Sequence, residues 1–161
     1  NTNSREVKKW QQPILKGKRL ALAGFLTKQV NGTTHYLVRY IVKPGLLKGN
    51  FTCTVNTSDI SNYNINKNLP KIQREILKNY FFNKKYNKNI IYDNIQSDEG
   101  GRFYHSQVRN IILELNKNEE VKIDKYHIWV SYNQMIDLIK KQKFDIEARL
   151  LFACSNFENI I

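Results

Sequence analysis

Cysteine, proline and glycine are all scarce in this chain of 161 residues, which contains two cysteines, three prolines and seven glycines. Cys53 and Cys154 form neither a close pair nor a metal-binding spacing, which favours two reduced thiols in a cytosolic protein. Cys-x-x-Cys and His-Glu-x-x-His patterns are absent, so the sequence predicts no metal site. The P-loop, the Rossmann glycine fingerprint and the serine nucleophile elbow are absent as well, which argues against the enzyme classes built on them.

Long hydrophobic runs are missing too. No stretch of about 18 apolar residues occurs, so no transmembrane helix is predicted. Residues 1–6 contain no apolar segment and therefore predict no signal peptide, while the lack of an initiator Met is consistent with a fragment of a longer protein. The length fits one domain, and 41% hydrophobic with 25% charged residues is typical of a soluble globular protein. We therefore expect a cytoplasmic location.

Acidic residues are outnumbered by basic ones, 14 to 26, which gives a formal net charge of +12. A basic surface favours anionic partners, such as nucleic acid, a membrane surface or a phosphorylated small molecule. The lysines are scattered, as at 8–9, 84–85 and 140–141, and do not form one dense stripe. A nucleic-acid-binding domain is therefore kept only as a minor alternative, and we expect neither a nucleic-acid nor a membrane partner.

Local signals predict a mixture of strands and helices. Asn31-Gly32 between two β-rich runs predicts a hairpin over residues 20–42, and Ser131 with Gln134 has the pattern of a capping box that starts a helix. No internal repeat is evident. The order predicts an α+β domain with a mixed or antiparallel sheet covered by helices, preceded by an irregular arm. The expected elements are the arm 1–18, a short strand 51–55, a loop 58–68, a helix 69–82, a polar break 84–89, strands 89–96, 102–115 and 128–130, and helices 131–143 and 146–154.

The segment 96–110 surrounds a Gly-Gly turn with groups that transfer protons or bind anions. These groups are Asp98, Glu99, Arg102, Tyr104, His105 and Arg109. Loops held by strands often carry catalytic residues, so His105 is a candidate base, and Glu99 is another if it is partly desolvated. If residues 102–115 form one strand, Tyr104 and His105 point to opposite faces unless a bulge intervenes. The alternative is a hairpin with a solvated acidic tip.

Two further segments are candidate site components. Residues 54–58, with Asn62-Tyr63, are dense in small hydrogen-bonding side chains, which often hold sugars or phosphates; the alternative is a capped polar loop. Residues 147–149, Glu-Ala-Arg, can form an ion pair that orders a helix, and we favour this structural role over a role in a site. His35 and His127 are expected to be non-catalytic.

Motifs spread over nearly the whole chain carry a family resemblance. They are Arg-Glu-Val-Lys-Lys-Trp-Gln-Gln-Pro at 5–13, Gly-Phe-Leu at 24–26 with Asn-Gly at 31–32, Pro-Gly-Leu-Leu at 44–47, Thr54-Val55 with Asn62-Tyr63, Gln-Ser-Asp-Glu-Gly-Gly-Arg-Phe-Tyr-His at 96–105, and Glu-Ala-Arg-Leu-Leu-Phe-Ala-Cys at 147–154. In this order they resemble the NDP-hexose 2,3-dehydratases of deoxysugar biosynthesis. Asn56 stands where the family has glutamine, Asp98 where it has glutamate, and Cys53 where it has proline.

The resemblance implies a fold, an activity and a set of site residues. The implied fold is a single Nudix-like domain, residues 19–161, with a mixed β-sheet flanked by helices. The implied reaction removes the C2 hydroxyl and the C3 proton from a dTDP-linked 4-keto-6-deoxy sugar and needs no cofactor. The implied site contains Glu99, Tyr104 and His105 as catalytic groups, and Trp10, Thr54, Asn56, Tyr63, Gln96, Arg102, Arg109 and Arg149 as substrate-binding groups. Nudix metal-dependent hydrolysis is not expected, because only Arg74-Glu75 matches a fragment of the Nudix box.

Members of this family usually carry two tandem copies of the unit, whereas this chain has one and is most similar to the C-terminal copy. We therefore expect its partner to be either a second copy in a homodimer or a tandem repeat in a longer protein. The alternative to an active dehydratase is a non-catalytic nucleotide-sugar-binding module, or half of a tandem-repeat enzyme.

Overall fold

The computed structural model describes residues 11–16, 20–43, 48–61, 69–98 and 102–157. Trp10, Tyr63 and Glu99 lie outside these ranges. The site roles of all three residues and the division into an arm of 1–18 and a domain of 19–161 therefore stay predictions.

A long hairpin lies at the centre of the fold. Its strands, β2 (Ala21–Val30) and β3 (Thr33–Ile41), pair antiparallel on either side of Asn31 and Gly32. These two turn residues have φ values of 50° and 75°, in the left-handed region that Asn and Gly tolerate best. The predicted hairpin is confirmed.

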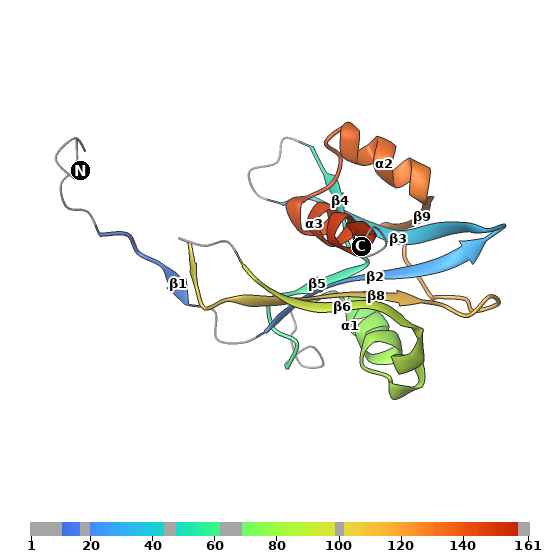
Figure 1. Ribbon diagram of the computed structural model, residues 1–161, viewed down its shortest axis with the longest axis horizontal. Helices are drawn as coiled ribbons and strands as arrows, with labels where there is room; N and C mark the ends of the chain where they lie inside the picture. The colour runs from blue at the N-terminus through green and yellow to red at the C-terminus, as the bar shows by residue number, and fades with distance from the viewer. Residues whose placement is uncertain (1–10, 17–19, 44–47, 62–68, 99–101, 158–161) are drawn as a thin grey trace.

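Around this hairpin the described strands build a seven-stranded sheet (Figure 1). The order is β4, β3, β2, β8 and β6, with β5 added to β2 and β9 added to β3. The parallel pair is β2 with β8, and the other pairs are antiparallel. The added strands are β4 (Asn50–Thr52), β5 (Val55–Thr57), β6 (Ile90–Ser97), β8 (Gln107–Glu114) and β9 (His127–Ser131). The sheet is therefore mixed, as expected.

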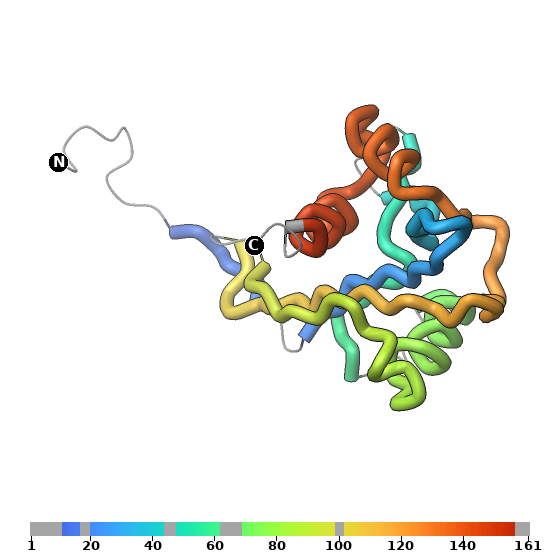
Figure 2. Tube along the Cα trace, turned by 45° about the vertical axis from the view of Figure 1, so that its right-hand side comes forward, coloured from blue at the N-terminus to red at the C-terminus, as the bar shows by residue number. Residues whose placement is uncertain are grey.

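Helices cover both faces of the sheet, and the tube trace separates the two helical layers (Figure 2). One face carries α1 (Lys71–Ile76), continued by the π-helical turn η2 (Leu77–Phe81), and the 3₁₀-helix η3 (Lys84–Asn89). The other face carries α2 (Tyr132–Lys140) and α3 (Ile146–Phe157). A mixed sheet between helices confirms the α+β class. Within the described residues, no helix combines the length and the apolar character needed to cross a membrane.

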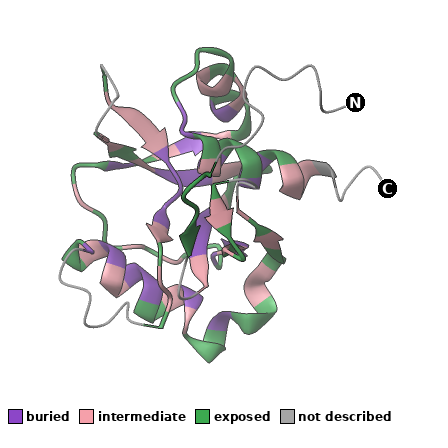
Figure 3. Ribbon diagram, turned by 90° about the vertical axis from the view of Figure 1, so that its left-hand side faces the viewer, coloured by how far each residue is buried: buried purple, intermediate pink, exposed green. Residues whose placement is uncertain are grey.

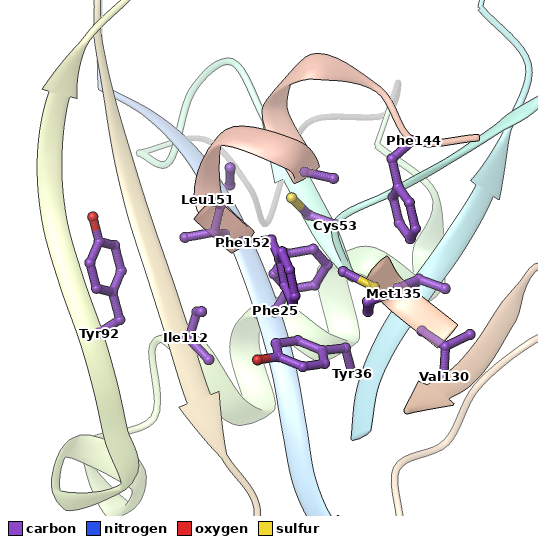
Figure 4. Close-up of a cluster of buried hydrophobic side chains, with 13 residues drawn as sticks. Phe25, Tyr36, Cys53, Tyr92, Ile112, Val130, Met135, Phe144, Leu151 and Phe152 are labelled. Atoms are coloured by element: carbon purple, nitrogen blue, oxygen red, sulfur yellow. The ribbon is translucent and has the colours of Figure 1, made fainter. Parts of the chain in front are cut away.

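Each helical layer encloses its own hydrophobic core. Successive side chains of a strand point to opposite faces, so Phe25 packs with Leu151 under α3 while Leu26 packs with Ile76 of α1. Figure 4 shows the first of these cores between the strands and α3. Buried residues accordingly concentrate on the strands and on the helix sides that face them (Figure 3).

The capping box is present: the Gln134 backbone N–H donates to the Ser131 hydroxyl, and the Gln134 side chain accepts from the Ser131 backbone N–H. The predicted polar break at 84–89, in contrast, is wrong. Those residues form η3, which is capped by the Asn83 side chain and anchored by the buried ring of Tyr86. One aromatic residue in a run of Lys and Asn is enough to dock this turn.

The predicted strand 51–55 is divided into β4 and β5, which pair with different neighbours. The chain crosses between them at Cys53 and Thr54, both fully buried. The Thr54 hydroxyl accepts from the Leu26 backbone N–H (2.9 Å) and donates to the Leu37 carbonyl. It thereby satisfies backbone groups of β2 and β3 that the interrupted strand leaves unpaired.

The predicted strand 102–115 is also interrupted. A two-residue strand, β7 (Phe103–Tyr104), precedes a break, and β8 begins only at Gln107. His105 lies in the break with a φ of 50°, so the alternation of side chains does not continue through it. β7 pairs in parallel with β1 (Leu15–Lys16), and the Leu15 N–H donates to the Arg102 carbonyl at 3.0 Å. This contact places the segment before β2 beside the end of the Gly-Gly turn.

Candidate functional site

A groove lies at the end of the sheet where β2 begins. It consists of two adjoining cavities of about 500 and 450 Å³. Both cavities are lined by Ala23, Asp98, Phe103, Val108 and Glu147, so we treat them as one site and call it the groove. The walls come from β1, β5, the end of β6, β7, β8 and the start of α3.

The floor of the groove is apolar and its rim is polar. Ala21 and Ala23 of β2, with Val108 of β8, leave the floor open because their side chains are small. The rim brings together amides, hydroxyls and charges of both signs: Lys16, Lys43, Asn56, Thr57, Ser58, Gln96, Asp98, Arg102, Ser106, Asn110 and Glu147. An apolar floor with a few convergent polar groups is the usual form of a small-molecule site.

Glu147 is held at the rim by two donors. The Asn56 side-chain amide donates to Glu147 Oε2 at 2.9 Å, and the Lys43 ammonium lies 3.6 Å from the same oxygen. Lys43 also forms an ion pair of 2.9 Å with Asp145. Burial lowers the pKa of Lys43, but the hydrogen bond to Asp145 and the charges of both carboxylates outweigh burial and raise that pKa above its ordinary value.

The start of α3 fixes the position of Glu147 along the groove. Asp145 Oδ1 accepts from the Ala148 backbone N–H at 3.0 Å, which is the bond of a helix N-cap. The Asp145 side chain is 8% exposed, whereas that of Glu147 is 44% exposed. The sequence analysis gave the 147–149 segment a structural role, but the structure places Glu147 in the groove, and Asp145 caps the helix instead.

Arg39 of β3 lies behind Asn56. Its Nη2 donates to Asn56 Oδ1 at 2.6 Å. The Gln73 amide satisfies both its donor and its acceptor when its oxygen faces Arg39 Nη1, at 3.2 Å. Arg39 Nε is buried with no partner among the described residues. Burial lowers the pKa of Arg39, and the electrostatic effects of Cys53, Asp145, Asp124 and Glu147 oppose this shift. The guanidinium nevertheless stays protonated.

A second pair of amides lies on the β6–β8 side of the groove. Asn110 is 3% exposed and donates to Gln96 Oε1 at 3.1 Å. Gln96 Nε2 in turn lies 3.5 Å from the Cys154 sulfur. Sequence reasoning selected Gln96 but not Asn110, although the alternation along residues 108–112 places Asn110 on the same sheet face as Val108 and Ile112.

Tyr104 and His105 lie next to each other beside the groove. Their rings meet edge to face with centroids 4.2 Å apart, and the Tyr104 ring lies 5.8 Å from the Lys16 ammonium. Tyr104 is 50% exposed and His105 is also exposed. Because the strand is broken at His105, the alternation that would send these two side chains to opposite faces does not apply to them.

The other predicted substrate-binding residues are dispersed. Arg102 lines the groove, whereas Thr54 is fully buried between β2 and β3. The Arg109 guanidinium makes a two-pronged contact with Asp93, at 2.8 and 2.5 Å, on the sheet face opposite Val108 and Asn110. Arg149 is exposed, and its Nε lies 3.4 Å from the Asp145 carbonyl oxygen.

The groove residues missed by sequence reasoning are Lys16, Lys43, Asn110 and Glu147. Glu147 lies in a motif that the sequence analysis quoted, two positions before Arg149, which was chosen in its place. The two lysines carried no signal, because 26 basic residues are spread along the chain and their positions in space depend on the fold.

The groove and the mixed sheet define an α+β unit with a cavity of the size of a small-molecule site, and comparison with known proteins identifies its family. The sequence profile of the NDP-hexose 2,3-dehydratases matches residues 1–155. The chain belongs to this family.

Curated relatives agree with this assignment. The chain is similar to three proteins named dTDP-4-dehydro-6-deoxy-α-D-glucopyranose 2,3-dehydratase, from Streptomyces violaceoruber (26% identity over 153 residues), Saccharopolyspora spinosa (24% over 162) and Amycolatopsis orientalis (29% over 156). The alignments cover 94%, 98% and 96% of this chain but 33%, 32% and 32% of those proteins. The chain therefore spans about a third of the length of the curated relatives it matches.

Two solved structures of an Ap4A hydrolase from C. elegans align with most of the chain. The first alignment covers 80% of this chain and 88% of the hydrolase chain, with a TM-score of 0.43 and 12% identity. The second, to a binary complex, covers 89% of this chain and 99% of the hydrolase chain, with a TM-score of 0.45 and 14% identity. Similarity at this level supports no conclusion about function, and the fold class rests on the sheet and helices described above.

Proposed function

We propose that this chain is a nucleotide-sugar 2,3-dehydratase unit that eliminates water from a dTDP-linked 4-keto-6-deoxyhexose in deoxysugar biosynthesis. The observation that carries the proposal is the family match over residues 1–155. The groove supports it, since the family-motif residues Gln96 and Glu147 converge there from β6 and α3, together with Asp98 directly after β6 and Arg102 directly before β7.

The chemistry explains why such a site needs acid, base and anion-binding groups but no redox cofactor. The C4 ketone acidifies the C3–H bond, because the resulting carbanion is an enolate. A base takes the C3 proton, the C3–H electrons form a C2=C3 double bond, and the C2–O bond breaks. An acid protonates the departing hydroxyl to give water, and a donor near O4 stabilises the developing charge.

Several roles in this reaction belong to the proposal. Tyr104 is a candidate acid or donor to O4, with Glu99 and His105 as candidate bases. Lys16 and Arg102, which line the groove, are positioned to bind the diphosphate. Arg109 is left out of this assignment, because Asp93 occupies its guanidinium edge. Trp10 and Tyr63 are candidates for stacking on the base or the sugar.

The test is turnover of dTDP-4-keto-6-deoxyglucose, followed by mass spectrometry as loss of one water and of the C2 oxygen. We expect the dehydrated product from this chain or from the longer polypeptide that contains it. A preparation that binds the substrate in a melting assay but never dehydrates it contradicts the proposal. Binding of DNA or RNA with a steep salt dependence, and no protection by dTDP, points to the nucleic-acid alternative.

A second candidate function is a nucleotide-sugar-binding unit that is inactive alone. The observation that favours it is the coverage of about a third of each relative's length. The proposal therefore includes a partner unit, either a second copy in a homodimer or another unit of the same polypeptide. It also includes a cytoplasmic location. Turnover that appears only when the longer polypeptide is used supports this second candidate.

A further inference from the structure

Glu147 is supported by a chain of hydrogen bonds that begins at a partly buried side chain. Arg39 donates to Asn56 at 2.6 Å, and Asn56 donates to Glu147 at 2.9 Å. The three residues come from β3, β5 and α3, and Asn56 and Glu147 are 91 positions apart in sequence. A link of this length between separate elements exists only in the folded unit.

The direction of each hydrogen bond follows from the chemistry of Arg39. A guanidinium can donate but cannot accept, so the Asn56 side chain must turn its oxygen toward Arg39. Its NH₂ group then points to Glu147, where the only suitable partner is an acceptor oxygen. Arg39 therefore fixes the Asn56 amide in the orientation that presents a donor to Glu147, and a carboxylate accepts hydrogen bonds without donating any.

Lys43 supplies the matching charge. It lies 3.6 Å from Glu147 Oε2 and 2.9 Å from Asp145 Oδ2. When Glu147 takes up a proton and becomes neutral, Lys43 keeps Asp145 as its partner. The groove can therefore lose the negative charge of Glu147 without leaving an unpaired cation, which would be costly in a partly buried site.

We propose that Glu147, in place of the candidate bases Glu99 and His105, removes the C3 proton of the ketosugar, and that Asn56 and Arg39 are its positioning residues. This inference rests on the proposed function. In the step, a Glu147 carboxylate oxygen forms an O–H bond with the C3 proton, and the C3–H electron pair moves into the enolate. The C2–O bond then breaks, and the leaving hydroxyl takes a proton from a separate acid, so that one water is released.

Asp98 also lines the groove, directly after the end of β6. Its backbone N–H donates to the Ser106 carbonyl at 2.9 Å. Glu147 is the groove carboxylate that accepts the hydrogen bond from Asn56, which Arg39 orients.

The primary test is Glu147→Gln, which keeps the shape and the hydrogen bond from Asn56 but removes the base. The preparation is the active dehydratase that contains this chain. We expect kcat to fall by about 100-fold or more, the usual contribution of a general base, with KM changed by less than about 3-fold. The matched control is Glu114→Gln, because Glu114 also accepts a side-chain amide bond (from Gln29, 2.7 Å) but lies outside the groove. It should retain activity.

A second measurement isolates proton removal. A substrate analogue without the C2 hydroxyl cannot eliminate water, but its C3 proton can still exchange with D₂O. We expect the unsubstituted enzyme to catalyse this exchange above the uncatalysed background and Glu147→Gln to lose it. If the unsubstituted enzyme dehydrates the substrate and Glu147→Gln still catalyses the exchange, the role of Glu147 is overturned, whereas the proposed function stands. Absence of both dehydration and exchange in the unsubstituted enzyme overturns the proposed function and this role with it.

The positioning roles have their own readout. Removing the Asn56 donor in Asn56→Ala leaves the Glu147 carboxylate without the bond that orients it, so kcat should fall more than KM changes. Arg39→Lys, which keeps the charge but loses the two-pronged geometry, should also lower kcat more than it changes KM. An unchanged kcat in Asn56→Ala, in a variant that melts like the unsubstituted protein, contradicts the positioning role.

Discussion

Arg109 and Asp93 face each other across the β6–β8 pair, with two guanidinium nitrogens at 2.8 and 2.5 Å from the two carboxylate oxygens. The hydrogen bonds that Arg109 donates to Asp93 are the main cause that raises the pKa of Arg109 above its ordinary value. This pair uses the guanidinium for structure, although the family resemblance implied a substrate-binding role for Arg109.

Substitution of Arg109 should therefore affect stability and leave substrate binding intact. We expect Arg109→Gln to cost about 1 kcal/mol of unfolding free energy, the scale of a well-formed but partly exposed ion pair, with KM unchanged. Arg102→Gln is the comparison, since Arg102 lines the groove, and it should raise KM. Chemical denaturation and steady-state kinetics on both variants measure the two effects, and a raised KM in Arg109→Gln would return Arg109 to the site.

Gly24 is required by the close approach of η2 to β2. A Cβ atom built at Gly24 would lie 2.6 Å from Cε1 of Phe81, a distance that real contacts do not reach. Gly24→Ala should therefore destabilise the fold by about 1–3 kcal/mol through overpacking, seen as a lower midpoint of chemical denaturation. The double variant Gly24→Ala/Phe81→Leu removes the clashing ring, so its two changes should cost less than the sum of the single ones. Simple additivity would contradict this explanation.

Leu151 and Leu150 are neighbours on α3 but differ in burial, with exposed fractions of 0% and 48%. Leu151→Ala should cost about 2–5 kcal/mol, because it leaves a cavity in the core under α3. Leu150→Ala should cost far less, since its side chain is half exposed. Thermal unfolding of the two variants provides a matched comparison on one helix, and equal losses would contradict the packing of α3 described above.

The lowered pKa of Asp124 makes the stability of the fold depend on pH in the acid range. Partial burial alone would raise its pKa, but the hydrogen bond from His127 (2.7 Å) and that from the Tyr126 N–H (2.9 Å) outweigh burial and lower that pKa below its ordinary value. A carboxylate with a lowered pKa in the folded state stabilises the fold above its unfolded-state pKa of about 3.9, and this contribution is lost as pH falls through the folded-state pKa. The expected profile is therefore a loss of stability confined to the acid range.

The variant Asp124→Asn tests this linkage. It should be less stable than the unsubstituted protein at pH 7, and the difference should shrink below about pH 4 as Asp124 becomes protonated. Denaturant titrations at several pH values measure the difference directly. Asp137→Asn, at an exposed position of α2, provides a control for general charge effects, and a difference for Asp124→Asn that stays constant down to pH 3 would contradict the proposed pKa shift.

Sequence reasoning succeeded where the deciding interactions are local. The Asn31-Gly32 hairpin depends on the φ preferences of two adjacent residues, and the Ser131–Gln134 capping box joins groups three residues apart. It failed at 84–89, where one buried ring outweighs the polar composition around it. At His105 it anticipated that only a bulge could bring neighbouring side chains together, but could not say whether a bulge is present.

The amino-acid sequence by itself determined the family, the hairpin, the main helices and the segment 96–110 as a place rich in reactive groups, because motifs and turn preferences are properties of neighbouring residues. Only the tertiary structure decided which of those groups share a groove. The Asn56–Glu147 bond spans 91 positions, and the two-pronged Arg109–Asp93 contact depends on the register of β6 against β8. Such contacts depend on where the whole chain brings distant segments together, and no local preference encodes them.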